Sequence, residues 1–142
     1  MKKTGWMILV VIAVLLAGAL WLAYSTHEEE RIARMTTGEA EITFVERTHD
    51  FGNIAPDGGP VHYDFEFTNT GSSPLVISEV ATYCGCVSGE FPLKPVKPGK
   101  KGHVKITYDP SGKSGAFTQT ATVVSNASNA YARVTISGNV IR

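Results

Sequence analysis

Two patterns of apolar and polar residues divide the chain. Residues 5–24, GWMILVVIAVLLAGALWLAY, contain no charged residue. A helix of this length rises about 30 Å, roughly the thickness of a bilayer's hydrocarbon core. From residue 41 onward, apolar and polar residues instead alternate, as they do in strands with one buried face. We therefore predict a transmembrane helix over residues 5–24 and a β domain over residues 41–142.

The charges that flank the apolar run predict its orientation. Lys2 and Lys3 precede it, and three glutamates at positions 28–30 follow it. Basic residues are retained on the cytoplasmic side of a membrane. We therefore expect residues 1–4 in the cytoplasm, a stalk over residues 25–40, and the C-terminal domain in a periplasmic or extracellular space.

A cleaved secretory signal is the alternative interpretation of the N-terminus. Residues 17–19 (Ala-Gly-Ala) have the small-x-small pattern of a cleavage site. Cleavage there would give a secreted protein. The apolar run continues past this site to Tyr24, beyond the usual length of a signal's apolar region, so we favour the uncleaved anchor.

Segments with a period of two predict the strands of the domain. The clearest is residues 61–68 (VHYDFEFT), in which the odd positions are apolar and the even positions polar. Further candidates are residues 42–47, 75–80, 104–108, 117–123 and 132–137. Residues 91–96 are too rich in proline for a central strand. Short strands at this spacing over about 100 residues predict an all-β fold, an antiparallel immunoglobulin-like β-sandwich of about seven strands.

The charge balance argues against a nucleic-acid partner. Lys and Arg number 13, Asp and Glu number 13, and the residues from Ala40 onward carry nine of each sign. A nucleic-acid-binding domain usually has a basic excess on one face. The lysines at positions 94, 97, 100 and 101 are interleaved with prolines and a glycine, a pattern typical of a solvated loop.

Cys84 and Cys86 are the only cysteines and the main candidates for chemistry. In a straight strand their Cα atoms would lie about 6.6 Å apart, near the upper limit for a disulfide. A bend at Gly85 would shorten this distance, since glycine accepts the backbone angles that a bend needs. A bridge between them would close a very small ring and remove little chain entropy.

Three interpretations of this pair remain open. We favour a local structural disulfide or two half-buried thiols. The pair could instead bind a soft metal, most naturally Cu(I), or act in redox chemistry. Zinc would require two further ligands, and the sequence does not bring His49, His62 or His103 to the cysteines. The Cys-x-x-Cys spacing at the start of a helix, as in thioredoxin-like proteins, is absent from the sequence.

Five short segments together resemble a known family. They are residues 49–52 (HDFG), 65–71 (FEFTNTG), 84–86 (CGC), 96–99 (VKPG) and 137–140 (SGNV). In this order they resemble a bacterial immunoglobulin-like family of unknown function with a Cys-Gly-Cys signature, similar to Hydin-type and major-sperm-protein-type sandwiches. Val87 departs from the pattern, because the resemblance implies Thr there. The resemblance implies a fold and an extracytoplasmic setting, with no established activity.

These observations favour a non-catalytic module that binds or scaffolds other molecules on the outer side of a membrane. We expect no enzyme activity and no cofactor, since the sequence contains no Gly-x-Ser-x-Gly motif and no distinctive carboxylate pair. The expected partners are the membrane, through residues 5–24, and a protein, but no nucleic acid. The alternatives are an accessory domain that handles metal or thiols through Cys84 and Cys86, and a structural spacer.

Overall fold

The computed structural model describes the backbone of residues 2–141 and the side chains of residues 5–25 and 38–141. The chain divides between Thr37 and Gly38 into two units, which are described separately. The glutamates at positions 28–30, and with them most of the predicted stalk, lie outside the described side chains.

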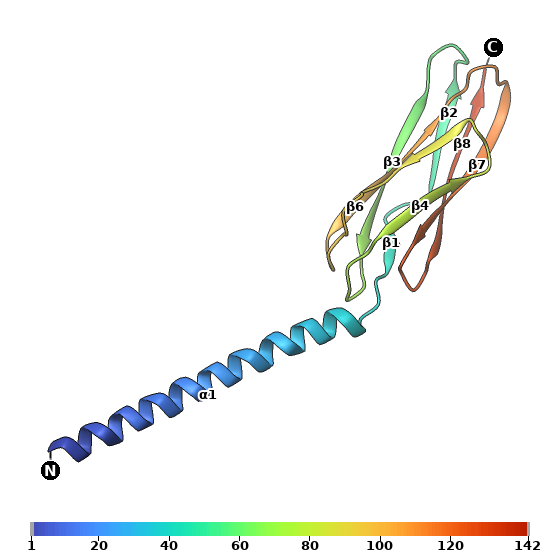
Figure 1. Cartoon of the computed structure of the whole chain (residues 1–142). Coiled ribbons are helices and arrows are strands. Elements are labelled where there is room, and N and C mark those ends of the chain that lie inside the picture. The colour runs from blue at the N-terminus through green and yellow to red at the C-terminus, as the bar shows by residue number, and fades with distance from the viewer. Residues whose placement is uncertain (1, 142) are drawn as a thin grey trace. The chain divides into compact units, whose positions relative to one another are not determined.

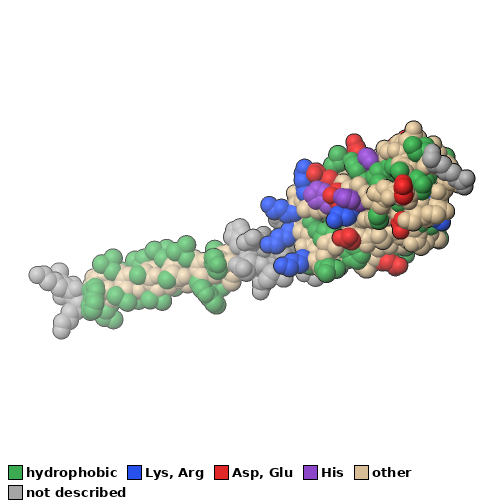
Figure 2. Space-filling model, turned by 90° about the horizontal axis from the view of Figure 1, so that it is seen from above, with side chains coloured by type: hydrophobic (Ala, Val, Ile, Leu, Met, Phe, Trp, Pro, Cys, Tyr) green, Lys and Arg blue, Asp and Glu red, His purple; other side chains and the backbone are tan. Residues whose placement is uncertain are grey.

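The first unit is a single helix, α1, over Lys2–Thr37. Its apolar part, Gly5–Ser25, has 21 residues and a mean hydropathy of 2.6, so it is long and apolar enough to cross a membrane. Hydrophobic side chains cover it along its length (Figure 2). A signal sequence would meet the same criteria, so the helix is a membrane anchor or a signal.

The second unit is a sandwich of two four-stranded sheets (Figure 1). Its strands are β1 (Ile42–Phe44), β2 (Thr48–Ile54), β3 (Val61–Asn69), β4 (Ile77–Thr82), β5 (Val87–Glu90), β6 (Lys101–Tyr108), β7 (Gly115–Ser125) and β8 (Tyr131–Val140). One sheet has the order β1-β3-β6-β5 and the other the order β2-β8-β7-β4. This layout confirms the predicted immunoglobulin-like sandwich.

The first strand of the sandwich is divided between the two sheets. β1 pairs antiparallel with β3, whereas β2 pairs parallel with β8. The chain crosses between the sheets over residues 45–47, where the amide of Thr135 donates to the carbonyl of Arg47 at 2.7 Å. The predicted antiparallel sandwich therefore includes one parallel pair among its named strands, because β8 runs in the same direction as the divided first strand, whereas β3 runs in the opposite direction.

Alternating side chains from both sheets form the core. The core includes side chains of which at most 1% of the surface is exposed: Phe65 and Phe67 of β3, Val104 of β6, Val123 of β7 and Val134 of β8. Their polar neighbours along each strand face outward. The alternation read from the sequence therefore identified the buried face of these strands correctly.

Two strands were not predicted. β2 is largely polar, and a bulge between Asp50 and Asn53, where Gly52 has a φ of 66°, interrupts its period. β5 has four residues, of which only Val87 is buried. Residues 91–96 form no strand, as predicted, although Val96 makes an isolated bridge with Leu75.

One end of the sandwich is held by asparagine side chains that bond to backbone groups. Asn129 accepts from the amide of Ile42 at 3.1 Å and donates to its carbonyl at 2.7 Å. Asn126 accepts from the amide of Val76 at 2.8 Å and donates to the carbonyl of Pro74 at 3.0 Å. Each side chain thereby replaces a missing strand neighbour.

Asn69 is the buried member of this group, with 0% of its surface exposed. Its amide nitrogen donates to the carbonyls of Ser73 at 2.8 Å and Val96 at 2.9 Å. Its oxygen accepts from the amides of Gly71 at 3.0 Å and Glu41 at 3.4 Å. A single side chain thus connects the start of β1, the β3–β4 turn and the β5–β6 loop.

Candidate functional site

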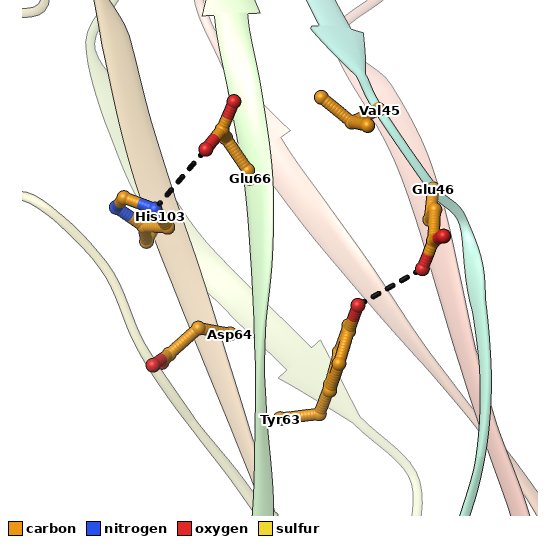
Figure 3. A pocket seen from close by; sticks show the side chains of 6 residues that line it. All are labelled: Val45, Glu46, Tyr63, Asp64, Glu66 and His103. Atoms are coloured by element: carbon orange, nitrogen blue, oxygen red, sulfur yellow. Dashed lines mark hydrogen bonds and ion pairs between the residues drawn. The ribbon is translucent and has the colours of Figure 1, made fainter.

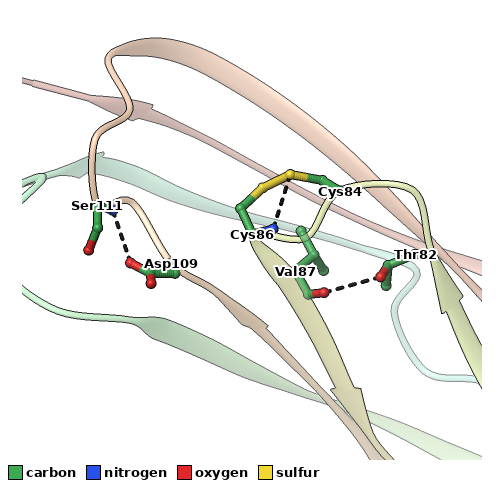
Figure 4. Close-up of a disulfide and its surroundings, with 6 residues drawn as sticks. All are labelled: Thr82, Cys84, Cys86, Val87, Asp109 and Ser111. Atoms are coloured by element: carbon green, nitrogen blue, oxygen red, sulfur yellow. Dashed lines mark hydrogen bonds between the residues drawn. A yellow bond between two sulfur atoms is a disulfide. The ribbon is translucent and has the colours of Figure 1, made fainter.

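The two cysteines lie in the turn that joins β4 to β5 (Figure 4). A disulfide links Cys84 to Cys86, whose Cα atoms are 5.1 Å apart. This separation is shorter than in a straight strand, because the chain bends between them. Both side chains are half-buried and pack against the rim of the core, whereas the adjacent Tyr83 is 95% exposed.

Backbone hydrogen bonds define the shape of this turn. The amide of Val87 donates to the carbonyl of Cys84 at 3.0 Å, and the amide of Asp109 donates to the carbonyl of Cys86 at 2.8 Å. The hydroxyl of Thr82 donates to the carbonyl of Val87 at 3.1 Å. These bonds tie the turn to the ends of β4, β5 and β6 independently of the disulfide.

Two expectations about neighbouring residues change with the structure. Gly85 does not have a φ in the left-handed region, and a Cβ placed there would meet nothing within 4 Å. The bend therefore does not require glycine. Val87, where the resemblance implied Thr, is 6% exposed and belongs to the core, so an apolar side chain suits the position.

A small pocket opens beside the disulfide. It has a volume of about 260 Å³, and its lining residues are Pro60, Gly85, Cys86, Val87, Ser88, Thr107 and Asp109. Asp109 is its charged member. Hydrogen bonds from the side chain and the backbone of Ser111 hold the pKa of the Asp109 carboxyl below its usual value, so this carboxylate is ionised at neutral pH.

The candidate zinc ligands do not gather around the cysteines. His49 stacks on Tyr63 with ring centroids 3.7 Å apart, and His103 faces Glu66 at 3.6 Å. His62 lies exposed on β3. Within the described part of the chain, no group of three or more His, Cys, Asp or Glu side chains is placed to hold a metal ion. Metal binding would also require the reduced pair, since only thiolates are ligands.

A larger pocket lies along β3, beside the crossover between β1 and β2 (Figure 3). Its volume is about 390 Å³, and its lining residues are Val45, Glu46, Tyr63, Asp64, Glu66 and His103. The crossover between β1 and β2 supplies Val45 and Glu46, β3 supplies the next three residues, and β6 supplies His103. Val45 is 67% exposed and gives the pocket an apolar wall.

Two polar contacts fix the walls of this larger pocket. The Tyr63 hydroxyl donates to Glu46 Oε2 at 2.9 Å, and this carboxylate raises the pKa of Tyr63 above its usual value. Lys101 Nζ lies 2.7 Å from Glu66 Oε1, and this hydrogen bond lowers the pKa of Glu66. With three carboxylates in its lining, the pocket is suited to binding a cationic group rather than an anionic one.

No motif in the sequence pointed to this larger pocket. Glu46, Asp64 and Glu66 read as ordinary polar positions of strands, and only the crossover brings Glu46 to Tyr63, 17 residues away. The sequence did indicate the lysine-rich loop as solvated, and Lys94, Lys97 and Lys100 are exposed in the structure. Basic side chains gather at one end of the sandwich in Figure 2.

Comparison with known proteins identifies the same region of the chain. Residues 42–140 match a family described as protein of unknown function (DUF1573). No curated protein matches the chain. A protein of unknown function from Porphyromonas gingivalis W83 has a similar structure, with a TM-score of 0.62 and 19% identity over 71% of this chain. The match covers 47% of the Porphyromonas protein, so this chain corresponds to about half of it.

Two further solved structures share the fold. The ASH / PapD-like domain 7 of human CEP192 has a TM-score of 0.59 and 13% identity, over 73% of this chain and 87% of that one. The VesB protease of Vibrio cholerae has a TM-score of 0.54 and 13% identity, over 79% of this chain and 35% of that one. At such identities the likeness shows the fold alone.

Proposed function

The chain belongs to the family described as protein of unknown function (DUF1573), and we propose that its sandwich is a non-catalytic binding module held outside the cytoplasm by residues 5–24. The lysines before the apolar helix support this orientation, because basic residues are retained on the cytoplasmic side. A largely apolar helical segment of 21 residues that is not cleaved would keep the module at the membrane.

The pocket on the β1-β3-β6-β5 sheet is the observation that carries the proposal. It combines an exposed apolar wall, Val45, with polar groups that are held in place by hydrogen bonds. Ligand sites commonly combine apolar surface with a few fixed polar groups. Its carboxylates fit a basic side chain of a protein partner.

A binding role without catalysis is consistent with the chemistry of this site. Tyr63 holds its proton more strongly than a free tyrosine, because Glu46 accepts its hydrogen bond and so raises the pKa of the hydroxyl. Glu66 is an ionised carboxylate paired with Lys101. Neither group has the pKa near neutrality that general acid–base catalysis favours.

We also propose that the Cys-Gly-Cys turn is a signature that other members of the family share.

Site-specific photo-crosslinking in intact cells tests the binding proposal. A photoreactive amino acid at Val45 of the full-length protein should give one discrete protein adduct, and Glu46→Gln should weaken it. The same amino acid at Thr122, on the outer face of the other sheet, serves as the control. Equal adducts from both positions, or no adduct at Val45, would contradict the proposal.

Protease accessibility tests the proposed location separately. Protease added to intact spheroplasts should remove the sandwich and leave a short membrane-bound fragment that contains α1. Protection of the sandwich until the membrane is permeabilised would reverse the orientation. Recovery of a mature chain that begins near Leu20 would replace the anchor by a cleaved signal.

A further inference from the structure

The disulfide joins two residues of one turn and cross-links no two elements of the sandwich. Cys84 and Cys86 are two positions apart in the sequence. A disulfide limits the freedom of the unfolded chain more strongly as the loop that it closes lengthens, and this loop is among the smallest possible. A role in holding the fold together therefore does not account for it.

Hydrogen bonds that do not involve the sulphur atoms hold the turn in addition to the disulfide. Three hydrogen bonds, at 3.0 Å from Val87 to Cys84, 2.8 Å from Asp109 to Cys86 and 3.1 Å from Thr82 to Val87, hold the backbone on both sides. None of them involves a sulphur atom. Reduction would consequently leave two thiols in place on a folded domain.

The two sulphur atoms differ in their surroundings. Cys86 lines the pocket of about 260 Å³, which gives an incoming thiol a route to this residue. Cys84 Sγ accepts a hydrogen bond from the amide of Cys86 at 3.2 Å (Figure 4). A donor aimed at a sulphur atom stabilises its thiolate form, and a more stable thiolate is a better leaving group.

The charge around the pocket bears on how Cys86 would react once the pair is reduced. Cysteine becomes a strong nucleophile when a cation or a helix N-terminus stabilises its thiolate. The residues that line this pocket include the carboxylate of Asp109 and no Lys or Arg. Once reduced, Cys86 would therefore attack another disulfide slowly. The size of the ring favours electron acceptance, because a half-exposed disulfide that adds little to the stability of the fold belongs to the labile, more easily reduced class.

We propose that the Cys84–Cys86 disulfide is an electron-accepting site for thiol–disulfide exchange with a dithiol. A thiolate of the dithiol attacks Cys86 Sγ through the pocket and forms a mixed disulfide. The bond between the two cysteines breaks, and Cys84 Sγ leaves with the electron pair and takes a proton from water. The second thiol of the dithiol, after losing its proton, attacks its own partner sulphur and releases Cys86 as a thiolate, which is then protonated. The dithiol becomes a disulfide, and two electrons and two protons reach the cysteine pair.

The exposed Tyr83 fits this role, because it offers an aromatic contact beside the reacting atoms for the surface that carries the dithiol. The proposal is separate from binding at the Val45 pocket, which has a different lining. Loss of either activity would leave the other intact.

The first test uses the unaltered full-length chain in detergent at neutral pH. The protein is mixed with reduced glutathione, a monothiol that cannot complete the exchange, and quenched with acid. Peptide mass spectrometry should find the glutathione adduct on Cys86 in at least about tenfold excess over Cys84, as expected for attack at one sulphur with the better leaving group opposite. An adduct mainly on Cys84, or equally on both, would overturn the proposed step.

The second test measures reduction by dithiothreitol without denaturant. Alkylation should show both thiols released while the far-ultraviolet circular dichroism stays unchanged. Ser88→Phe, which fills the pocket, should slow reduction by about tenfold, the effect expected when access limits the exchange. Glu90→Phe, two positions along the same strand and outside the pocket, should reduce at the rate of the unaltered chain.

Equal reduction rates for both variants, or reduction that occurs only in denaturant, would refute the site. If Ser88→Phe fails to fold, the position of the glutathione adduct on the unaltered chain decides the question.

Discussion

Replacing Asn69 by aspartate tests how far the sandwich depends on one buried amide. Aspartate has nearly the same shape and keeps the oxygen that accepts from Gly71 and Glu41. It loses the two N–H donors that bond to the carbonyls of Ser73 and Val96, of which the Val96 carbonyl keeps a second donor, the amide of Leu75 at 2.9 Å. At neutral pH it also places a negative charge at a residue with 0% exposure.

The expected loss of stability follows from these contacts. The Ser73 carbonyl loses the partner that Asn69 supplies, which costs about 1–3 kcal/mol for a buried group. The Val96 carbonyl keeps the bond from the amide of Leu75 and loses one hydrogen bond, worth about 0.5–1.5 kcal/mol. Desolvation of the charge adds to this loss. Since a small domain is stable by about 5–15 kcal/mol, we expect Asn69→Asp to remove about a third or more of the stability of this one at neutral pH.

The variant should also depend on pH in a defined direction. Burial and the two carbonyl oxygens raise the pKa of the introduced carboxyl group in the folded state above its unfolded value of about 3.9. Below that value both states are protonated and the loss is smallest. As the pH rises, the unfolded state ionises first, so stability should fall by up to about 1.4 kcal/mol per pH unit until the folded pKa is passed.

Urea unfolding of residues 38–142, which carry the buried core described above, provides the measurement at about pH 4 and about pH 7. Asn53→Asp is the matched control, because the exposed Asn53 only accepts a hydrogen bond, from Asn139 at 3.1 Å, and a carboxylate can accept it equally well. A loss below about 1 kcal/mol for Asn69→Asp would refute the reasoning. A pH dependence no steeper than that of the control would refute it as well.

Three further predictions concern the packing, one ion pair and the anchor. Gly71→Ala should destabilise the domain by at least about 1–3 kcal/mol, since the added Cβ would overlap the backbone of residues 39–41. Gly85→Ala, the control, should change the free energy of unfolding by less than about 0.5 kcal/mol, because its Cβ would meet no other atom within 4 Å. Equal effects of the two variants in urea unfolding would contradict the packing. Lys101→Gln should raise the pKa of Glu66 in a carboxyl NMR titration, because the hydrogen bond from Lys101 lowers it. The ionised Glu66 stabilises the fold above its unfolded pKa, and this contribution is lost as the pH falls through its folded pKa, so the variant should lack that pH dependence. An unchanged titration would show that the ion pair does not form in solution. The full-length protein should stay in the membrane fraction after carbonate washing, and its release would contradict the anchor.

The sandwich could be predicted because most of its strands encode their burial locally. In β3 the apolar odd positions identify the core face without reference to any partner. β2 offers no such signal, since its bulge at Gly52 interrupts the period and its partner β8 lies far along the chain. Its parallel pairing depends on where the chain crosses between the sheets, which is a property of the whole fold.

The candidate sites likewise differ in whether a local sequence signal marks them or only the whole fold brings them together. Cys84 and Cys86 could be singled out because they are neighbours in the sequence and lie in one turn. Asn69, in contrast, is followed by Thr70 and Gly71, a sequence typical of an exposed turn, and its burial results from contacts with a loop 27 residues away. Glu46 and Tyr63 likewise meet only through the crossover of the first strand.

The parallel pairing of β2 with β8 has a mechanical consequence. The two strands lie side by side near opposite ends of the domain's sequence, with Thr48 beside Thr135 and Ile54 beside Val140. A force that pulls Gly38 and Ile141 apart would slide these strands along each other, so their hydrogen bonds would bear the load together. An antiparallel pair pulled from adjacent ends would open one bond at a time. A domain built in this way resists stretching between its two ends far better than peeling from one of them.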